Sequence, residues 1–250
     1  MARNPVPSTW EKPLEHERAP VTIDKIRGQL TRPAHPNGAG ILLIPSRGGV
    51  GRGDEEMANW LGDAGFTTLA WDPFSHWAPD ISSEEKTQHI DGGDVPDAPS
   101  RAEHIKFLDY MEKELGLHSL GVTGTCMGGR MGLVAGAGDS RIKAASVFYA
   151  SLRPQAKEWE LDAATECTEM ETKVQIHYPK DDNVTPYQRI LDTRLVLEAR
   201  PGLPSTTVTV YPQAHHGFLG LAPDRPAADL AATHLAWPST IAFFRATLLE

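Results

Sequence analysis

Short hydrophobic runs along the chain alternate with longer segments in which hydrophobic and polar residues recur at helical spacing. The short runs, rich in β-branched residues, predict strands near residues 40–45, 67–71, 119–123, 144–149, 173–178 and 206–211. The longer segments predict helices near residues 54–64, 101–115, 129–138, 187–200 and 227–249. Regular alternation of strands and helices is typical of a mostly parallel sheet with helices on both faces. We therefore expect an α/β fold.

The same pattern predicts one domain. Residues 1–20, rich in proline and charge, are expected to form an arm on the surface, and residues 21–250 to form the α/β domain. Residues 21–32 are expected to form an early strand or hairpin edge. The connection at residues 74–99 is unusually long, and connections of this length are commonly functional or disordered. We expect it either to cover a site or to form a solvated excursion.

Charge and cysteine content narrow the classes of function. The chain has 24 Lys and Arg against 33 Asp and Glu, a net charge of −9, which argues against a nucleic-acid-binding protein. No apolar run approaches the roughly 20 residues that span a bilayer, and the first residues lack the apolar segment of a signal peptide. Two cysteines, Cys126 and Cys167, do not make a disulfide framework. We therefore expect a cytoplasmic protein without a membrane segment.

A glycine-rich turn centred on a cysteine occupies residues 124–129, Gly-Thr-Cys-Met-Gly-Gly. It lies between a predicted strand and a predicted helix, which is the arrangement of a nucleophile elbow with cysteine in place of serine. Side chains two residues either side of the nucleophile would collide in such a turn, hence the glycines. The helix N-terminus would favour a thiolate on Cys126. The alternative interpretation is a tight packing turn around a small buried thiol.

An acid follows in the order that such an elbow requires. Pro-Lys-Asp-Asp-Asn-Val comes directly after the predicted strand at residues 173–178, and an acid just past a strand can reach across the sheet edge to orient a histidine. Asp181, three residues before Val184, is the expected acid. Asp182 is the alternative, because either aspartate also suits the cap of the next helix.

The third group is a histidine on the loop after the strand predicted at residues 206–211. Of the adjacent pair, His216 is preferred and His215 is possible, with Gly217 allowing the backbone to turn beside them. A surface pair or a metal pair is the alternative. Adjacent histidines seldom share a metal, however, and no Cys, His or Glu cluster at ligand spacing accompanies them.

Taken together, these motifs resemble the dienelactone hydrolase family of the α/β-hydrolase superfamily, over about residues 20–248. The resemblance lies in the Gly-x-Cys-x-Gly-Gly turn, the Asp before Val, and Tyr-Pro-Gln-Ala-His-His-Gly-Phe at residues 211–218. It implies a single α/β-hydrolase domain with a catalytic triad of Cys126, Asp181 and His216.

Two features of the family are missing. The family has a glutamate in the loop after the first core strand, where this chain has Ser46, and an arginine four residues after the histidine, where this chain has Gly220. Ser46 and Arg130 are therefore candidate substrate contacts. The candidate arginines for binding a substrate carboxylate are Arg47, Arg52, Arg130, Arg153 and Arg225.

The glycine-rich segment 48–53 has two interpretations. A phosphate-binding loop would need a glycine where Asp54 stands, so the dinucleotide fingerprint is broken. A loop that helps to form an oxyanion hole fits better, and the expected donors are the backbone amides of Met127 and Arg47.

We therefore expect a cysteine hydrolase that acts on a small lactone or carboxylic ester, without a metal or an organic cofactor. Conversion of dienelactone to maleylacetate is the best single expectation. The expected partner is a small-molecule substrate, with no nucleic acid and no membrane, and the protein is expected to be a monomer or small homo-oligomer. The alternatives are a catalytically silent ligand-binding protein of the same fold and an NAD(P)-binding domain.

Overall fold

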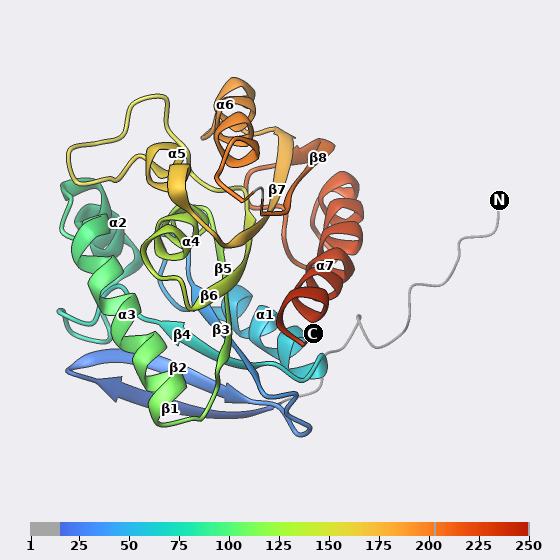
Figure 1. Cartoon of the computed structure of the whole chain (residues 1–250). Helices are drawn as coiled ribbons and strands as arrows, with labels where there is room; N and C mark the ends of the chain where they lie inside the picture. Colours follow the sequence, from blue (N-terminus) through green and yellow to red (C-terminus); the bar gives the residue numbers. More distant parts are fainter. Residues whose placement is uncertain (1–15, 203, 250) are drawn as a thin grey trace.

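The computed structural model describes residues 16–202 and 204–249. They form an α/β fold around one sheet of eight strands (Figure 1). The strand order is β1-β2-β4-β3-β5-β6-β7-β8. The strands are β1 (Glu17–Ile23), β2 (Ile26–Arg32), β3 (Ala39–Ile44), β4 (Thr67–Trp71), β5 (Ser119–Thr125), β6 (Ile142–Phe148), β7 (Lys173–Asp181) and β8 (Thr206–His215). The helices are α1 (Arg52–Asp63), α2 (Ser83–Gly92), α3 (Asp97–Lys113), α4 (Met127–Gly138), α5 (Ala163–Glu166), α6 (Tyr187–Glu198) and α7 (Ala227–Leu248).

Six of the strands, β3 to β8, run parallel, whereas β1 and β2 form an antiparallel hairpin at one edge. Asp24 and Lys25 turn this hairpin with positive φ angles of 47° and 71°, as a two-residue hairpin turn requires. β2 then pairs antiparallel with β4. The predicted fold class, a mostly parallel α/β sheet with helices on both faces, is confirmed.

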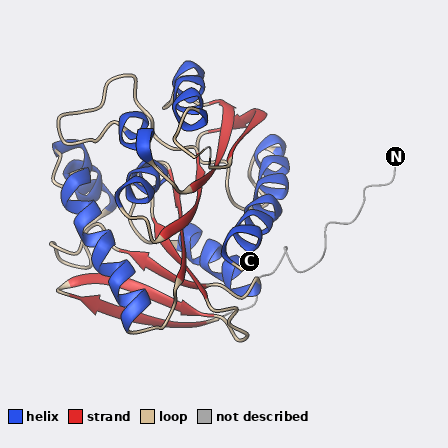
Figure 2. Cartoon of the chain, viewed as in Figure 1, coloured by secondary structure: helices blue, strands red, loops and turns tan. Residues whose placement is uncertain are grey.

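Helices cover both faces of the sheet (Figure 2). Two hydrophobic clusters, one on each face, form the core. On one face α1 and α7 meet, with the rings of Trp60 and Trp237 4.8 Å apart. On the other face α3, α4 and α6 supply buried residues such as Phe107, Met131 and Ile190. The central strands are buried on both faces, which is why they read as continuous apolar runs rather than alternating ones.

Every strand and helix predicted from the pattern is present, with ends that differ by a few residues. At the N-terminus, β1 begins at Glu17, so residues 17–20 belong to the sheet and not to the expected arm. Residues 1–15 of that arm lie outside the described residues.

The pattern missed α2, which lies inside the long connection. Ser82 and Glu85 form a capping box at its start, and Gly93 ends it with a φ of +85°. None of its residues is buried, so it has no hydrophobic stripe to find.

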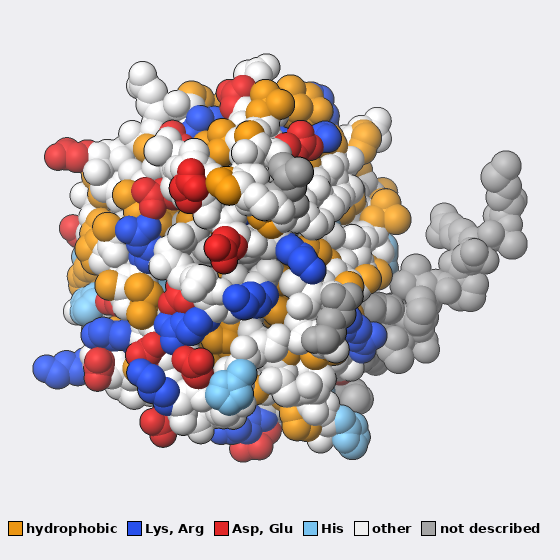
Figure 3. Space-filling view, viewed as in Figure 1, with side chains coloured by type: hydrophobic (Ala, Val, Ile, Leu, Met, Phe, Trp, Pro, Cys, Tyr) orange, Lys and Arg blue, Asp and Glu red, His pale blue; other side chains and the backbone are white. Residues whose placement is uncertain are grey.

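The charged surface is mixed. On the face shown in Figure 3, basic and acidic side chains are interspersed. Within residues 16–202 and 204–249, no helix combines the length and apolar character needed to cross a bilayer.

Candidate active site

A cavity of about 500 Å³ lies where the carboxyl ends of the parallel strands converge. Its lining comes from the loops after β3, β5, β6 and β8 and from the start of α1. Crevices at the carboxyl ends of strands are where α/β sheets bind ligands. The polar, charged and aromatic residues that line it include Ser46, Arg47, Asp54, Cys126, Tyr149, His216 and Arg225.

Cys126 stands at the sharp turn between β5 and α4, with a φ of +53°. A non-glycine residue in this region is strained, and the surrounding structure must hold it there. Two hydrogen bonds do so. The Cys126 N–H donates to the Phe148 carbonyl at 3.1 Å, and the Ser151 N–H donates to the Cys126 carbonyl at 3.0 Å. The backbone geometry of the predicted elbow is confirmed.

The flanking glycines are required by close backbone contacts. A Cβ on Gly124 would clash with the backbone of Gly128, and a Cβ on Gly128 would clash with the carbonyls of Ile44 and Pro45, all well under 3.0 Å. The first turn of α4 therefore packs directly on the end of β3. The partly buried Cys126 lines the cavity at the N-terminus of α4.

His216 is paired with Asp182. The His216 Nδ1 lies 2.9 Å from the Asp182 Oδ2 and 3.1 Å from its Oδ1, and the Asp182 side chain is fully buried. The same carboxylate accepts the N–H groups of Val184 at 2.7 Å and Thr185 at 2.9 Å. One aspartate therefore both shapes the turn and orients the histidine.

Asp181, the expected acid, is not the aspartate that contacts His216. β7 continues three residues beyond its predicted end and includes Asp181, which pairs with His215 across the sheet edge and is exposed. The chain turns only after β7, so the next residue, Asp182, is the one that reaches His216. The preference for His216 over His215 is consistent with this geometry, since His216 lines the cavity.

The electrostatic setting of His216 favours its charged form. Burial would lower its pKa, but the hydrogen bond to Asp182 and the proximity of Cys126 raise the pKa to about 9. The imidazole Nε2 is buried and has no hydrogen-bond partner within the described part of the chain. The Tyr149 ring packs edge-on against the imidazole, with centroids 5.1 Å apart. Nε2 is thus left free for the proton of the thiol.

His215 has a different role. Asp229, at the start of α7, accepts the His215 N–H at 2.9 Å and lies 3.1 Å from its Nδ1. The loop turns through positive φ angles of 63° at Gln213 and 82° at Gly217. These contacts fix the loop that carries His216.

The loop after β3 places two further predicted residues, Ser46 and Arg47, in the cavity wall. The Arg47 guanidinium donates to the Asp91 carboxylate of α2 at 3.0 Å, so the long connection reaches the rim of the cavity. Met127 begins α4, and its backbone N–H, in the first turn of the helix, has no intrahelical partner.

Arg130 does not reach the cavity, which corrects its assignment as a substrate contact. It is buried against α3 and forms ion pairs with Asp97 and, at 3.4 Å, with Glu160. These partners are 33 and 30 positions away in the sequence, so local pattern gave no sign of them. Buried cations are normally paired in this way.

Arg225 is the arginine that lines the cavity without a carboxylate partner among the described residues. Its guanidinium folds back to donate to the Gly217 carbonyl at 2.7 Å. It lies against Gly220, where a Cβ would be 2.7 Å from its Nε. Arg225 therefore reaches the cavity from a position five residues beyond Gly220 in the sequence.

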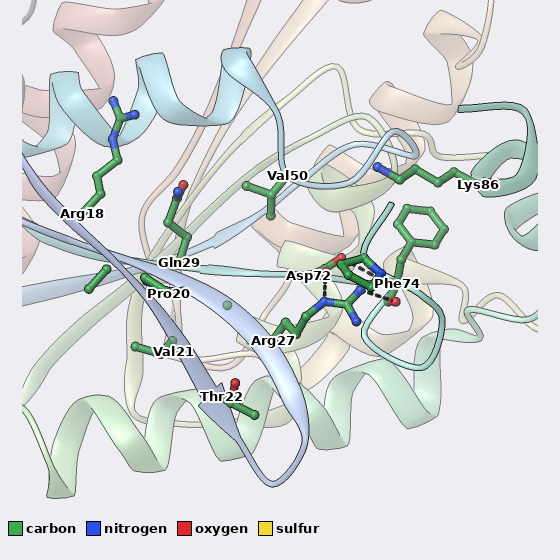
Figure 4. A pocket seen from close by; sticks show the side chains of 13 residues that line it. Arg18, Pro20, Val21, Thr22, Arg27, Gln29, Val50, Asp72, Phe74 and Lys86 are labelled. Carbon is green, nitrogen blue, oxygen red and sulfur yellow. Dashed lines mark hydrogen bonds and ion pairs between the residues drawn. The ribbon is translucent and has the colours of Figure 1, made fainter. Parts of the chain in front are cut away.

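A second cavity of about 330 Å³ lies between the β1–β2 hairpin and the start of the long connection (Figure 4). In it, Arg27 donates to the Asp72 carboxylate at 2.8 Å and to nearby backbone carbonyls. None of the predicted site residues lines it, and Val50 lies at its border with the glycine-rich loop.

The sheet order and the elbow define an α/β-hydrolase fold. Residues 26–248 match the sequence profile of the Dienelactone hydrolase family, and the chain belongs to that family. The resemblance predicted from the motifs is thus confirmed.

Solved structures with the same fold have low sequence identity to this chain. A putative dienelactone hydrolase from Klebsiella pneumoniae superposes with a TM-score of 0.78 at 20% identity, covering 92% of this chain and 99% of the other. A dienelactone hydrolase-like promiscuous phosphotriesterase from metagenomic libraries gives 0.74 at 19% identity, covering 92% and 98%. A dienelactone hydrolase from Anabaena variabilis gives 0.65 at 18% identity, covering 94% and 98%. No curated protein matches the chain significantly in sequence.

Proposed function

We propose that this protein hydrolyses small carboxylic esters or lactones, with Cys126 as the nucleophile. The observation that carries the proposal is the buried His216–Asp182 pair, whose free Nε2 shares a cavity with the sulfur at the elbow. A nucleophile, a base and a group that orients the base are the three parts of a catalytic triad. Membership of the dienelactone hydrolase family supports the same chemistry.

In the first half-reaction, the Cys126 sulfur attacks the carbonyl carbon of the substrate while its proton resides on His216 Nε2. The carbonyl oxygen becomes an oxyanion held by the N–H groups of Met127 and Arg47. Collapse of this intermediate breaks the ester C–O bond and forms a thioester. The His216 imidazolium gives its proton to the leaving alcohol or enol oxygen.

In the second half-reaction, His216 takes a proton from water, and the resulting hydroxide attacks the thioester carbonyl. The same two N–H groups hold the second oxyanion. The C–S bond then breaks, the thiolate returns with the imidazolium beside it, and the acid product leaves. Asp182 keeps the ring oriented and stabilises its charge throughout.

The substrate class follows from the size and charge of the cavity. About 500 Å³ suits a small molecule, and Arg225, which has no carboxylate partner among the described residues, offers its guanidinium to a substrate carboxylate. We propose dienelactone, which would give maleylacetate, as the first substrate to test. Two free cysteines support a reducing compartment, and we propose the cytoplasm.

A panel of lactones and 4-nitrophenyl esters, assayed on the wild type and on Cys126→Ala, tests the function. We expect turnover by the wild type, none above background by Cys126→Ala, and an acyl adduct on Cys126 detected by mass spectrometry after rapid acid quenching. Turnover that persists in Cys126→Ala would refute the nucleophile. A wild type that binds substrates but never forms the adduct would favour a ligand-binding protein instead.

A further inference from the structure

Asp54 is a carboxyl group in the wall of the proposed active site that the mechanism above does not use. It lies in the first turn of α1, is only 8% exposed, and lines the same cavity as Cys126, His216 and Arg225. Carboxyl groups this deeply buried are normally paired with a cation. Asp54 has no such partner within the part of the chain that the structure describes.

The two carboxyl oxygens of Asp54 have different surroundings. Oδ2 accepts the Gly51 N–H at 3.0 Å, which caps α1. Among the described residues, no other side chain donates a hydrogen bond to the Asp54 carboxyl group or forms an ion pair with it, although Asp54 lines the cavity. Helix capping thus accounts for one carboxyl oxygen, and no side-chain partner accounts for the other.

Several charged or titratable groups surround this carboxyl. Glu55 follows it on α1, and Tyr149 packs at the end of β6, where its hydroxyl is influenced by both Asp54 and Arg225. Burial raises the pKa of Asp54 to about 6, opposed by hydrogen bonds from the Gly51 and Asp54 backbone. The other groups that share the cavity are Arg47, Cys126, His216 and Arg225.

We propose that the Asp54 carboxylate sets the charge selectivity of the cavity, by opposing the binding of anionic substrates and of the carboxylate product. The inference rests on the proposed ester hydrolysis, because only then does every turnover leave a carboxylate in this cavity. Arg225 attracts such a group and Asp54 repels it. Ionised Asp54 therefore weakens the attraction of Arg225 for an anionic substrate such as dienelactone and helps the acid product to leave, whereas protonated Asp54 lets Arg225 act unopposed.

The test compares two substrates with the same leaving group. Mono-4-nitrophenyl succinate is anionic above about pH 5, and 4-nitrophenyl pentanoate is a neutral ester of similar length. The readout is the ratio of kcat/KM for the anionic to the neutral ester, because general losses of activity cancel in it. We expect Asp54→Asn to raise this ratio about tenfold at pH 8, from one charge removed at close range. In the wild type the ratio should fall as pH rises through about 6, and in Asp54→Asn it should not.

Two variants serve as controls. Glu55→Gln removes the same charge one position along α1, at a side chain that pairs with Arg18 outside the cavity, and should leave the ratio unchanged. Asp54→Glu keeps the charge and should keep the ratio low even if the cap is disturbed. A ratio that is the same in the wild type and Asp54→Asn would overturn the inference. A wild type with no Cys126-dependent hydrolysis of the neutral ester would instead refute the proposed function.

Discussion

The two cysteines of this chain occupy opposite chemical environments. Cys126 is half-exposed in a strained turn, at a helix N-terminus and beside a histidine whose pKa is raised. Cys167 is fully buried in a short turn after α5, where its thiol lies 4.0 Å from the Leu133 carbonyl. Burial raises the pKa of Cys167 to about 12.

The contrast shows how the surroundings of a cysteine determine the expected reactivity of its thiol. Both side chains are small and slightly polar, and only one has a base, a helix dipole and an open cavity. Buried in an apolar setting, the other behaves as a small hydrophobic residue. Four experiments, in order of decreasing expected effect, test whether the surroundings described above produce this difference.

The largest effect should come from removing each thiol in turn. Cys126→Ala should lower kcat/KM for 4-nitrophenyl pentanoate by about 10³-fold or more, because the nucleophile is lost. Cys167→Ala should keep activity near that of the wild type and lower the free energy of unfolding by about 1 kcal/mol. Steady-state kinetics and urea unfolding measure both. Loss of activity in a stably folded Cys167→Ala would reverse the assignment.

Next in size is the effect of the acid that orients His216. Asp182→Asn should cost about 10²-fold or more in kcat, because the imidazole loses its orienting partner. Asp181→Asn is the matched control, an adjacent and exposed carboxylate, and should change kcat less than about twofold. If Asp181→Asn were the inactive variant, the pairing seen between His216 and Asp182 would not be the one used in turnover.

Alkylation compares the two thiols within one molecule. Limiting iodoacetamide should label Cys126 at least about tenfold faster than Cys167, because the thiolate is the reacting form and Cys167 is both protonated and buried. Peptide mapping by mass spectrometry at short times gives the ratio. The same reaction on urea-unfolded protein is the control, and there the two rates should converge. A folded protein labelled equally at both sites would contradict the contrast.

The smallest effect concerns stability against pH. The pKa of folded His216, about 9, exceeds the ordinary value of a histidine, so its pairing stabilises the fold fully below the unfolded pKa. That contribution should disappear as pH rises through about 9. Asp182→Asn should flatten this part of the profile, as measured by urea unfolding between pH 6 and pH 10. An unchanged slope would mean that the His216–Asp182 pair is not charged in the wild type.

The sequence predicted the parts of this site that depend on local geometry. The Gly-x-Cys-x-Gly spacing predicted the elbow because one of the steric conflicts that it avoids, between Gly124 and Gly128, lies within five residues. The conflict of Gly128 with Ile44 and Pro45 appears only in the fold. The choice between Asp181 and Asp182 depended on where β7 ends, and single residues at strand ends are the least certain part of any pattern. Because β7 runs three residues further than predicted, Asp181 lies in the strand and Asp182 is the aspartate that contacts His216.

The arginines depend on long-range contacts. Arg130 is held by carboxylates that lie far away in the sequence, and Arg225, one of the five candidate arginines, lies against Gly220 in the cavity wall. A single sequence does not display such tertiary contacts, so it did not separate Arg225 from the other candidates. The helix α2 was missed for another reason, because none of its residues is buried and it has no hydrophobic periodicity to detect.

The contact between Gly128 and the end of β3 has a consequence for mutational robustness. It joins two backbones, the first turn of α4 and the carbonyls of Ile44 and Pro45, with no side chain between them. Met127 and Arg47 lie one and two residues from this junction, so the spacing of their N–H groups is inherited from main-chain packing. Side chains around the cavity can therefore diversify without changing that spacing. Gly128 cannot be replaced in this way, because any side chain there would clash with the two carbonyls. A laboratory evolution experiment should therefore find many accepted substitutions at the rim of the cavity and none at Gly128.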